Sequence, residues 1–140
     1  MILVIRISGL VDVPRKLQEG LFRIRLRRKY SATLLRPTPE NIKLLRHLRN
    51  HVAFGEIDND TLSLLVEKRA ELKSKSKKSS TTNIIDQIEK KDMKLWEIKP
   101  FFRLHPPRGG IDSKNHFGTS KKSVLGDNKK EINNLLRRML

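Results

Sequence analysis

Five positively charged side chains fall within the seven residues 23–29. One or two cations suffice to stabilise the C-terminal end of a helix, because the effect of the helix dipole fades within the last turn. Five cations exceed that need, and their density favours contact with phosphate groups. A solvated cationic turn is the alternative interpretation. The five residues are Arg23, Arg25, Arg27, Arg28 and Lys29.

Residues 101–110 combine an aromatic pair, alternating basic and apolar side chains, two prolines and two glycines. Pro106 lacks an N–H group and restricts His105 to an extended conformation. We therefore expect an extended basic loop, anchored by at least one phenylalanine in the core. Arg103, His105 and Arg108 would then project outward, where such side chains can stack on exposed RNA bases or pair with phosphates.

A further basic stretch, residues 72–80, is rich in lysine and serine and lacks an apolar period. We interpret it as a flexible cationic segment, which is either a solubilising linker or a phosphate contact that orders on binding. Lysine implies point-charge contacts and not bidentate reading of bases. The candidate RNA-binding residues of this stretch and of the later chain are Lys73, Lys75, Lys77, Lys78, Lys114, Lys121 and Lys122.

No arrangement of residues indicates catalysis or a bound metal. His47 and His51 have a spacing that can chelate zinc, but no third ligand follows at a recognisable interval and the chain has no cysteine. Residues 118–123 partly match a phosphate-binding Walker loop, but the upstream glycine and the preceding strand are missing. We therefore expect no metal, no cofactor, no small-molecule substrate and no enzymatic activity.

The charge balance points to a polyanionic partner. The chain carries 31 Lys and Arg residues against 15 Asp and Glu residues, which gives a formal net charge of +16. Nucleic acid and an anionic membrane surface are the two candidates. No apolar run approaches a membrane span, and no expected helix concentrates bulky apolar residues opposite a basic face. The apolar N-terminus lacks the basic region of a signal peptide, so we expect a cytoplasmic protein.

Apolar periodicity predicts the elements that position these basic segments. Residues 1–57 alternate between β-branched apolar runs and segments with apolar side chains at helical spacing. We expect an α/β (α+β) fold, a small split β-α-β-α-β ferredoxin-like sheet covered on one face by two helices, with right-handed crossovers where strands run parallel. The expected strands are residues 2–8, 30–36 and 52–57, and the expected helices are residues 14–28 and a helix capped by Thr38 and begun by Pro39.

Two glycines interrupt these elements. Gly20 lies inside the first expected helix, where glycine costs about 1 kcal/mol relative to alanine. Gly55 lies inside the third expected strand. We interpret Gly20 as a site of close packing and Gly55 as a bulge or a close approach of another chain segment.

Residues 58–140 are predicted to form a helical and extended basic extension, packed as one unit on the core of residues 1–57. One helix follows the cap at Asp58, and a second begins at residues 82–83. Residues 112–130 are polar and punctuated by glycine, and we expect them to be irregular. The apolar stripe of the closing helix, residues 130–140, consists of Ile132, Leu135, Leu136 and Met139.

Several segments, in this order, resemble the L-thirty family of large-subunit ribosomal proteins. After a first strand come the basic helix end RIRLRR at residues 23–28, the turn Thr38-Pro39 and the strand VAFGEID at residues 52–58. The run FFRLHPPRGG at residues 101–110 is similar to the hallmark of the family's archaeal branch, which is related to the eukaryotic L-seven proteins. Bacterial members resemble only residues 1–57, whereas the archaeal resemblance covers nearly the whole chain.

The resemblance implies a non-enzymatic structural component of the archaeal large (50S) ribosomal subunit. It implies 23S rRNA as the main partner, 5S rRNA as a second candidate, and neighbouring large-subunit proteins. The fold it implies, a compact α/β core with a helical C-terminal extension, agrees with the periodicity. We expect binding through phosphate and 2′-OH groups, with little reading of sequence.

Two other classes of protein share the charge signature. A basic DNA-binding architectural protein is the first alternative, although a helix-turn-helix signal is absent and the α/β order with a long extended loop argues against it. An interaction module for an acidic protein or a membrane surface is the second.

Overall fold

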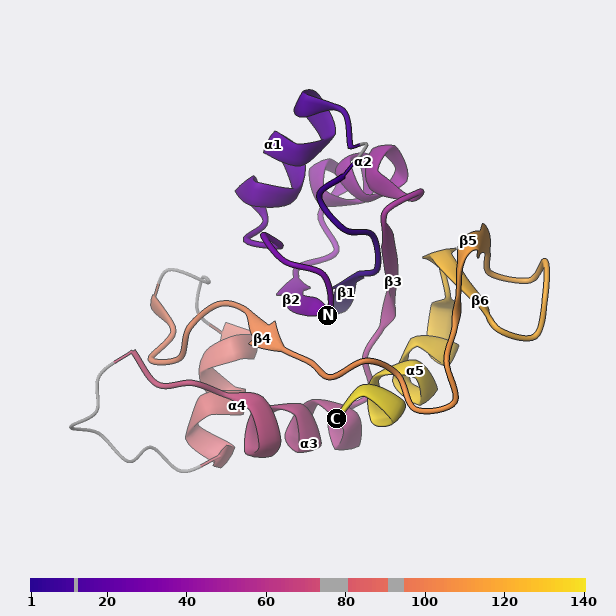
Figure 1. Cartoon of the computed structure of the whole chain (residues 1–140). Helices are drawn as coiled ribbons and strands as arrows, with labels where there is room; N and C mark the ends of the chain where they lie inside the picture. The colour runs from indigo at the N-terminus through magenta and orange to yellow at the C-terminus, as the bar shows by residue number, and fades with distance from the viewer. Residues whose placement is uncertain (12, 74–80, 91–94) are drawn as a thin grey trace.

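The computed structural model describes residues 1–11, 13–73, 81–90 and 95–140, and it forms one six-stranded mixed sheet between two layers of helices (Figure 1). The strand order is β4-β2-β1-β3-β6-β5. The strands are β1 (Ile2–Arg6), β2 (Ser31–Leu35), β3 (Val52–Glu56), β4 (Phe102–Arg103), β5 (Asp112–His116) and β6 (Ser123–Asp127). The helices are α1 (Arg15–Arg23), α2 (Pro39–Leu48), α3 (Asn59–Arg69), α4 (Thr81–Lys90), the short 3-10 helix η2 (Lys129–Glu131) and α5 (Ile132–Met139). In these ranges no helix combines the length and the hydropathy needed to cross a membrane.

The first part of the chain forms the predicted split β-α-β-α-β arrangement. β1 pairs antiparallel with β2 on one side and with β3 on the other, so that β2 and β3 run parallel with β1 between them. β1 is buried on both faces, because its alternate side chains enter two separate cores. The predicted ferredoxin-like fold class is confirmed.

Helices α1 and α2 cover one face of this sheet. Their core contains Leu21, Leu45 and Leu48 from the helices, packed against Val4 and Val52 from β1 and β3. The predicted start of α2 is confirmed: the Thr38 hydroxyl accepts a hydrogen bond from the Asn41 backbone N–H group at 3.3 Å, and proline occupies the first helical position.

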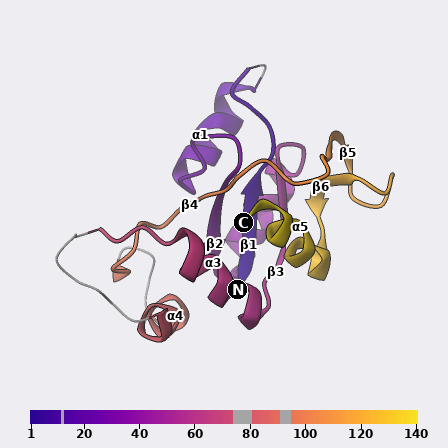
Figure 2. The ribbon, with the colours of Figure 1, turned by 60° about the horizontal axis from the view of Figure 1, so that its bottom comes forward.

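The later helices cover the opposite face. Figure 2 shows α3 and α5 in front of the strands, and their apolar side chains share one core with α4 and the inner residues of the sheet. The predicted stripe of the closing helix is confirmed, since all four of its apolar side chains are buried. The α3 side chains predicted to point inward, Leu62, Leu65 and Val66, are buried as well.

Two expectations about the chain after residue 100 were wrong. Residues 112–130 are not irregular: β6 pairs parallel with β3, and β5 pairs with β6. β6 contains only two bulky apolar residues, Val124 and Leu125, and β5 is almost entirely polar, so neither shows a strand period. In addition, part of the expected extended loop is strand β4, which pairs with β2. One sheet therefore contains strands from both sides of residue 57, after which the predicted extension begins.

Helix α1 ends five residues earlier than predicted, at Arg23. The Leu26 N–H group donates to the Leu21 carbonyl and the Arg25 N–H group donates to the Phe22 carbonyl, each at 2.9 Å. This pair of bonds closes a Schellman motif, in which Arg25 occupies the left-handed position with φ 65°. Glycine usually fills that position, so the helix end has no signal in the residue pattern.

A buried arginine connects the end of β1 with the chain that follows α1. The Arg6 guanidinium donates to the backbone carbonyls of Ser8 at 3.0 Å, Gly9 at 2.6 Å and Leu26 at 2.7 Å. The Arg6 side chain is fully buried, and burial lowers the pKa of its guanidinium. In the described part of the chain no carboxylate pairs with it, so backbone dipoles alone compensate its charge.

Replacing Arg6 by Met is expected to lower the free energy of unfolding by about 1–3 kcal/mol, because it leaves the buried Leu26 carbonyl without a donor, whereas the bonds to Ser8 and Gly9 are only partly buried. Urea denaturation of the full chain measures the change. Arg6→Lys is the control: its single ammonium group cannot serve three carbonyls at once, so an intermediate loss is expected. Equal stability of the Arg6→Met variant and the unaltered chain would show that the Arg6 hydrogen bonds do not stabilise the connection between β1 and the chain after α1.

The two glycines give opposite expectations for alanine substitution. A Cβ atom at Gly55 would overlap the Lys129 carbonyl oxygen, which confirms the predicted close approach, whereas a Cβ atom at Gly20 would lie 3.5 Å from the nearest Leu48 carbon. We expect Gly55→Ala to destabilise by about 1–3 kcal/mol and Gly20→Ala to stabilise by about 0.5–1 kcal/mol. Urea denaturation of both variants tests the pair, and effects of the same sign would contradict it.

Candidate nucleic-acid interface

The pairing of β4 with β2 brings together the two basic segments that the sequence analysis treated as separate. Arg103 stands opposite Ser31, and Phe102 stands opposite Ala32. As a result, side chains from residues 25–28 and from residues 101–103 surround one hollow of about 300 Å³. We call this site the cationic hollow. Its lining residues are Arg25, Arg27, Arg28, Phe101 and Arg103.

The polar side chains of the cationic hollow have no hydrogen-bond or ion-pair partner in the described chain, although Arg103 faces the Phe101 ring. In the described part of the chain, its four guanidinium groups donate no hydrogen bond and form no ion pair. No carboxylate lines the hollow. Four like charges on one concave surface repel one another, and an anionic ligand would relieve that repulsion. The arrangement is that of an anion-binding site.

The backbone beneath these side chains is held firmly. Apolar Ile24 and Leu26 are buried, which turns the intervening Arg25 outward. The Leu26 carbonyl accepts the hydrogen bond from Arg6, and the Arg28 carbonyl accepts one from the Ser31 hydroxyl. The guanidinium groups therefore project from a fixed loop, so that little backbone ordering is required when a ligand binds.

Phe102 and Phe101 have different environments. Phe102 is fully buried in the core, which confirms that at least one phenylalanine anchors this segment. Phe101 is half-buried and its ring forms a wall of the cationic hollow. The guanidinium carbon of Arg103 lies 5.9 Å from the centre of the Phe101 ring, a cation–π distance. Phe101 was not among the predicted RNA-binding residues, because the residue pattern does not show which of the two phenylalanines lies in the core.

Beyond β4 the chain runs along the C-terminal end of α5 as an extended strap. The His105 and Arg108 backbone N–H groups donate to the Met139 and Arg138 carbonyls, each at 3.0 Å. The Arg138 guanidinium in turn donates to the Arg108 carbonyl at 2.9 Å and to the Gly110 carbonyl. The side chains of His105 and Arg108 are exposed, as expected. Arg138 was not among the predicted residues. The signal that could have indicated it is the pair of basic residues, Arg137 and Arg138, in the last turn of α5.

Of the remaining predicted residues, some flank the cationic hollow in the sequence and others lie at the opposite edge of the sheet. Arg23 ends α1 with its side chain exposed, and the Lys29 ammonium lies 4.9 Å from the centre of the Tyr30 ring. Lys73 is exposed. β4 and β5 are the opposite edges of the sheet (Figure 1), so the basic residues of β5 and of the turn after it lie far from the hollow. Those distant residues are Lys114, Lys121 and Lys122, whereas Lys75, Lys77 and Lys78 lie outside the described residues.

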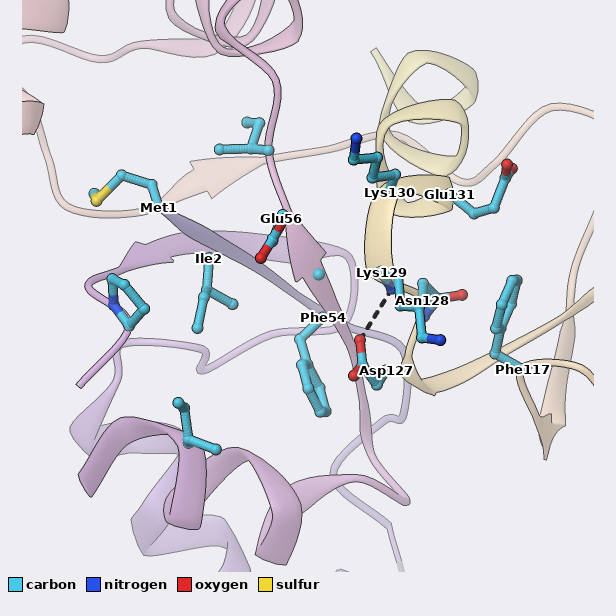
Figure 3. A pocket seen from close by; sticks show the side chains of 14 residues that line it. Met1, Ile2, Phe54, Glu56, Phe117, Asp127, Asn128, Lys129, Lys130 and Glu131 are labelled. Atoms are coloured by element: carbon cyan, nitrogen blue, oxygen red, sulfur yellow. Dashed lines mark hydrogen bonds between the residues drawn. The ribbon is translucent and has the colours of Figure 1, made fainter. Parts of the chain in front are cut away.

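A larger groove of about 800 Å³ has a different character (Figure 3). Its lining is mainly apolar and includes Ile2 and Phe54. Three carboxylates and two lysine ammonium groups also line it, and the Asp127 carboxylate accepts a hydrogen bond from the Lys129 backbone N–H group at 2.9 Å. Because its acidic and basic groups nearly balance, this groove does not favour a polyanion.

The histidine pair shows no metal-binding geometry. His51 Nδ1 lies 3.1 Å from the Ser8 hydroxyl, and burial, together with the positive charge of Arg6, lowers the pKa of His51. His47 is exposed. Among the described residues, no three His, Cys, Asp or Glu side chains converge as a metal site would require.

Comparison with known proteins identifies full-length relatives, although no family model matches the chain. The chain is 34% identical over 154 residues to large ribosomal subunit protein uL30 of Korarchaeum cryptofilum, covering 100% of this chain and 95% of the relative. It is 34% identical over 154 residues to uL30 of Archaeoglobus fulgidus, covering 99% of each chain. It is 32% identical over 153 residues to uL30 of Methanobrevibacter smithii, covering 100% of each chain.

The left-handed conformation of Arg25 predicts a gain in stability on replacement by glycine. A side chain in this conformation costs about 1–2 kcal/mol. Glycine avoids this cost, but part of the gain is offset because glycine loses more conformational entropy on folding. Arg25→Gly is therefore expected to raise the free energy of unfolding by about 0.5–1 kcal/mol in urea denaturation. Arg25→Ala removes the same charge but keeps the strained conformation, so it should show no comparable gain. Equal effects of both substitutions would contradict the assignment.

Proposed function

Because the chain belongs to the uL30 family of large ribosomal subunit proteins, a non-enzymatic family, we propose that it binds folded large-subunit rRNA through the cationic hollow and the adjoining strap. Its role is that of a structural constituent of the large subunit. The observation that carries the proposal is the cluster of four guanidinium groups that, in the described chain, donate no hydrogen bond and form no ion pair.

The chemistry of the hollow suits an RNA backbone. Guanidinium groups pair with phosphate oxygens in a bidentate manner, and their charge assists the hydrogen bonds. Contacts of this kind position a protein on RNA without reading its sequence, and 2′-OH groups supply further partners. On this proposal Arg25, Arg27, Arg28 and Arg103 contact phosphates directly, while Arg23 and Lys29 extend the same surface.

The strap widens the proposed interface. His105 and Arg108 are exposed on a backbone that Arg138 fixes to the end of α5, so they offer a second row of donors beside the hollow. At the opposite edge of the sheet, the lysines of β5 and its turn would contact another RNA segment. The lysines at residues 73–78 complete the proposed set. On this proposal 23S rRNA is the main partner and 5S rRNA a second candidate, with neighbouring large-subunit proteins around them.

The proposal predicts a strong dependence of rRNA affinity on salt that diminishes when the hollow loses its charge. Each phosphate contact contributes about 0.7–0.9 to the slope of log affinity against log salt concentration. A triple variant, Arg27→Gln, Arg28→Gln and Arg103→Gln, should therefore lower that slope by about 2–3 relative to the unaltered chain. Filter binding of the full chain to deproteinised large-subunit rRNA, over a series of salt concentrations, measures it.

A matched control removes the same charge elsewhere. Lys16, Lys43 and Lys90 are exposed on α1, α2 and α4, and none lines the hollow. Changing these three to Gln should leave most of the salt dependence intact. Equal losses in both triple variants would show that net charge alone governs binding, and an affinity independent of salt would eliminate the phosphate mechanism. Equally tight binding to duplex DNA would favour the architectural alternative.

A further inference from the structure

An aromatic ring inside a group of guanidinium side chains needs an explanation that phosphate binding does not supply. The negative face of an aromatic ring repels an anion, so a site built for phosphate alone gains nothing from Phe101. A ligand with both a negative charge and a flat aromatic surface would use both kinds of group. A nucleotide has this combination.

The position of Phe101 is fixed from both sides of the chain. The preceding Pro100 carbonyl accepts a hydrogen bond from the buried Thr33 hydroxyl at 3.1 Å, and the following Phe102 is fully buried and pairs with Ala32. The Phe101 ring is thus held at the wall of the cationic hollow, opposite Arg103. A planar ring and a planar guanidinium are the two groups on which RNA-binding proteins stack bases.

The size of the hollow limits what can enter it. Its volume of about 300 Å³ is at the lower end of the range for small-molecule sites, about 300–1,000 Å³. A paired helix cannot present a base to such a site, because its bases are stacked and its deep major groove is closed to side chains. An unpaired nucleotide at a bulge or loop can.

We infer that the cationic hollow holds one unstacked nucleotide of an unpaired RNA segment, with its base against Phe101 and Arg103, while the guanidinium groups of Arg25, Arg27 and Arg28 divide between its phosphates and the edge of its base. The inference rests on the proposed function, since it requires that the chain bind RNA at all. It adds that the recognised feature is an unpaired nucleotide, and that a helix without one is bound less tightly.

The lining also selects among bases. Its four polar side chains are guanidinium groups, which donate hydrogen bonds and accept none. Guanine presents two adjacent acceptors, N7 and O6, which match a guanidinium in a bidentate manner. Adenine and cytosine present an amino donor beside an acceptor, and that donor finds no acceptor among these side chains. Guanine is therefore favoured over adenine and cytosine.

The test uses three fluorescein-labelled RNA hairpins that are identical except for the bulge: no bulge, one bulged guanine or one bulged cytosine. Fluorescence anisotropy measures the affinity of the full chain for each hairpin. The unaltered chain should bind the guanine bulge about tenfold more tightly than the unbulged hairpin, as expected for one stacked base. Cytosine should give a smaller advantage. Equal affinity for the bulged and unbulged hairpins overturns the inference, and equal affinity for the two bulged bases overturns the selection of guanine.

Three variants separate stacking from charge and from folding. Phe101→Leu should lose the advantage of the bulge while binding the unbulged hairpin as before, and Phe101→Tyr should keep it. Phe117→Leu changes an exposed phenylalanine that lies beyond β5 and does not line the hollow, so it should also keep the advantage. Thermal melting of each variant checks its folding. A bulge advantage that survives Phe101→Leu in the folded protein overturns the inference.

Failure of the proposed function has a different signature. If the unaltered chain binds none of the hairpins and does not bind large-subunit rRNA, the RNA-binding proposal itself is wrong. If it binds every hairpin with equal affinity and loses that affinity in the Arg27→Gln variant, phosphate binding stands and the nucleotide site does not. The two failures are thus distinguished by the same set of measurements.

Discussion

The buried guanidinium of Arg6 is the interaction on which the arrangement of the functional surface depends. Taking an arginine charge out of water is costly, and here three backbone carbonyls compensate the cost without a carboxylate partner in the described chain. One of these carbonyls belongs to Leu26, in the loop that carries Arg25, Arg27 and Arg28. The end of the central strand therefore sets the position of these cations, and the proposed binding surface is joined to the core by hydrogen bonds and apolar packing.

The sheet performs the second part of the positioning. β4 is only two residues long, yet its pairing with β2 places Arg103 beside the loop after α1. On the other side of the sheet, the approach of the Lys129 carbonyl to Gly55 fixes η2 and α5 against β3, and α5 in turn holds the strap. Both contacts join segments distant in sequence, so the interface exists only when the core and the later chain are folded together.

Local patterns predicted much of this fold, and long-range pairing accounts for what they missed. The apolar periods of β1, β2, β3 and α5 were sufficient, because each of these elements buries a regular stripe or a full strand. The end of α1 was missed because arginine occupies a position usually taken by glycine, and β5 was missed because its side chains face solvent. Charge density predicted Arg25, Arg27 and Arg28, and the residue pattern of 101–110 predicted Arg103. Their grouping with Phe101 depends on the β4–β2 pairing, which leaves no periodic signal.

The clustered guanidinium groups give dissolved salt two opposing effects. In the free protein, the repulsion among the four charges of the cationic hollow opposes folding, and counterions screen that repulsion. In the complex with RNA that we propose, RNA phosphates neutralise these charges, and added salt competes with the phosphates. Ionic strength therefore protects the unassembled chain while loosening its attachment to RNA. Before assembly, small ions screen the repulsion among the four guanidinium groups, and in the proposed complex the phosphates of the nucleic acid neutralise the same charges.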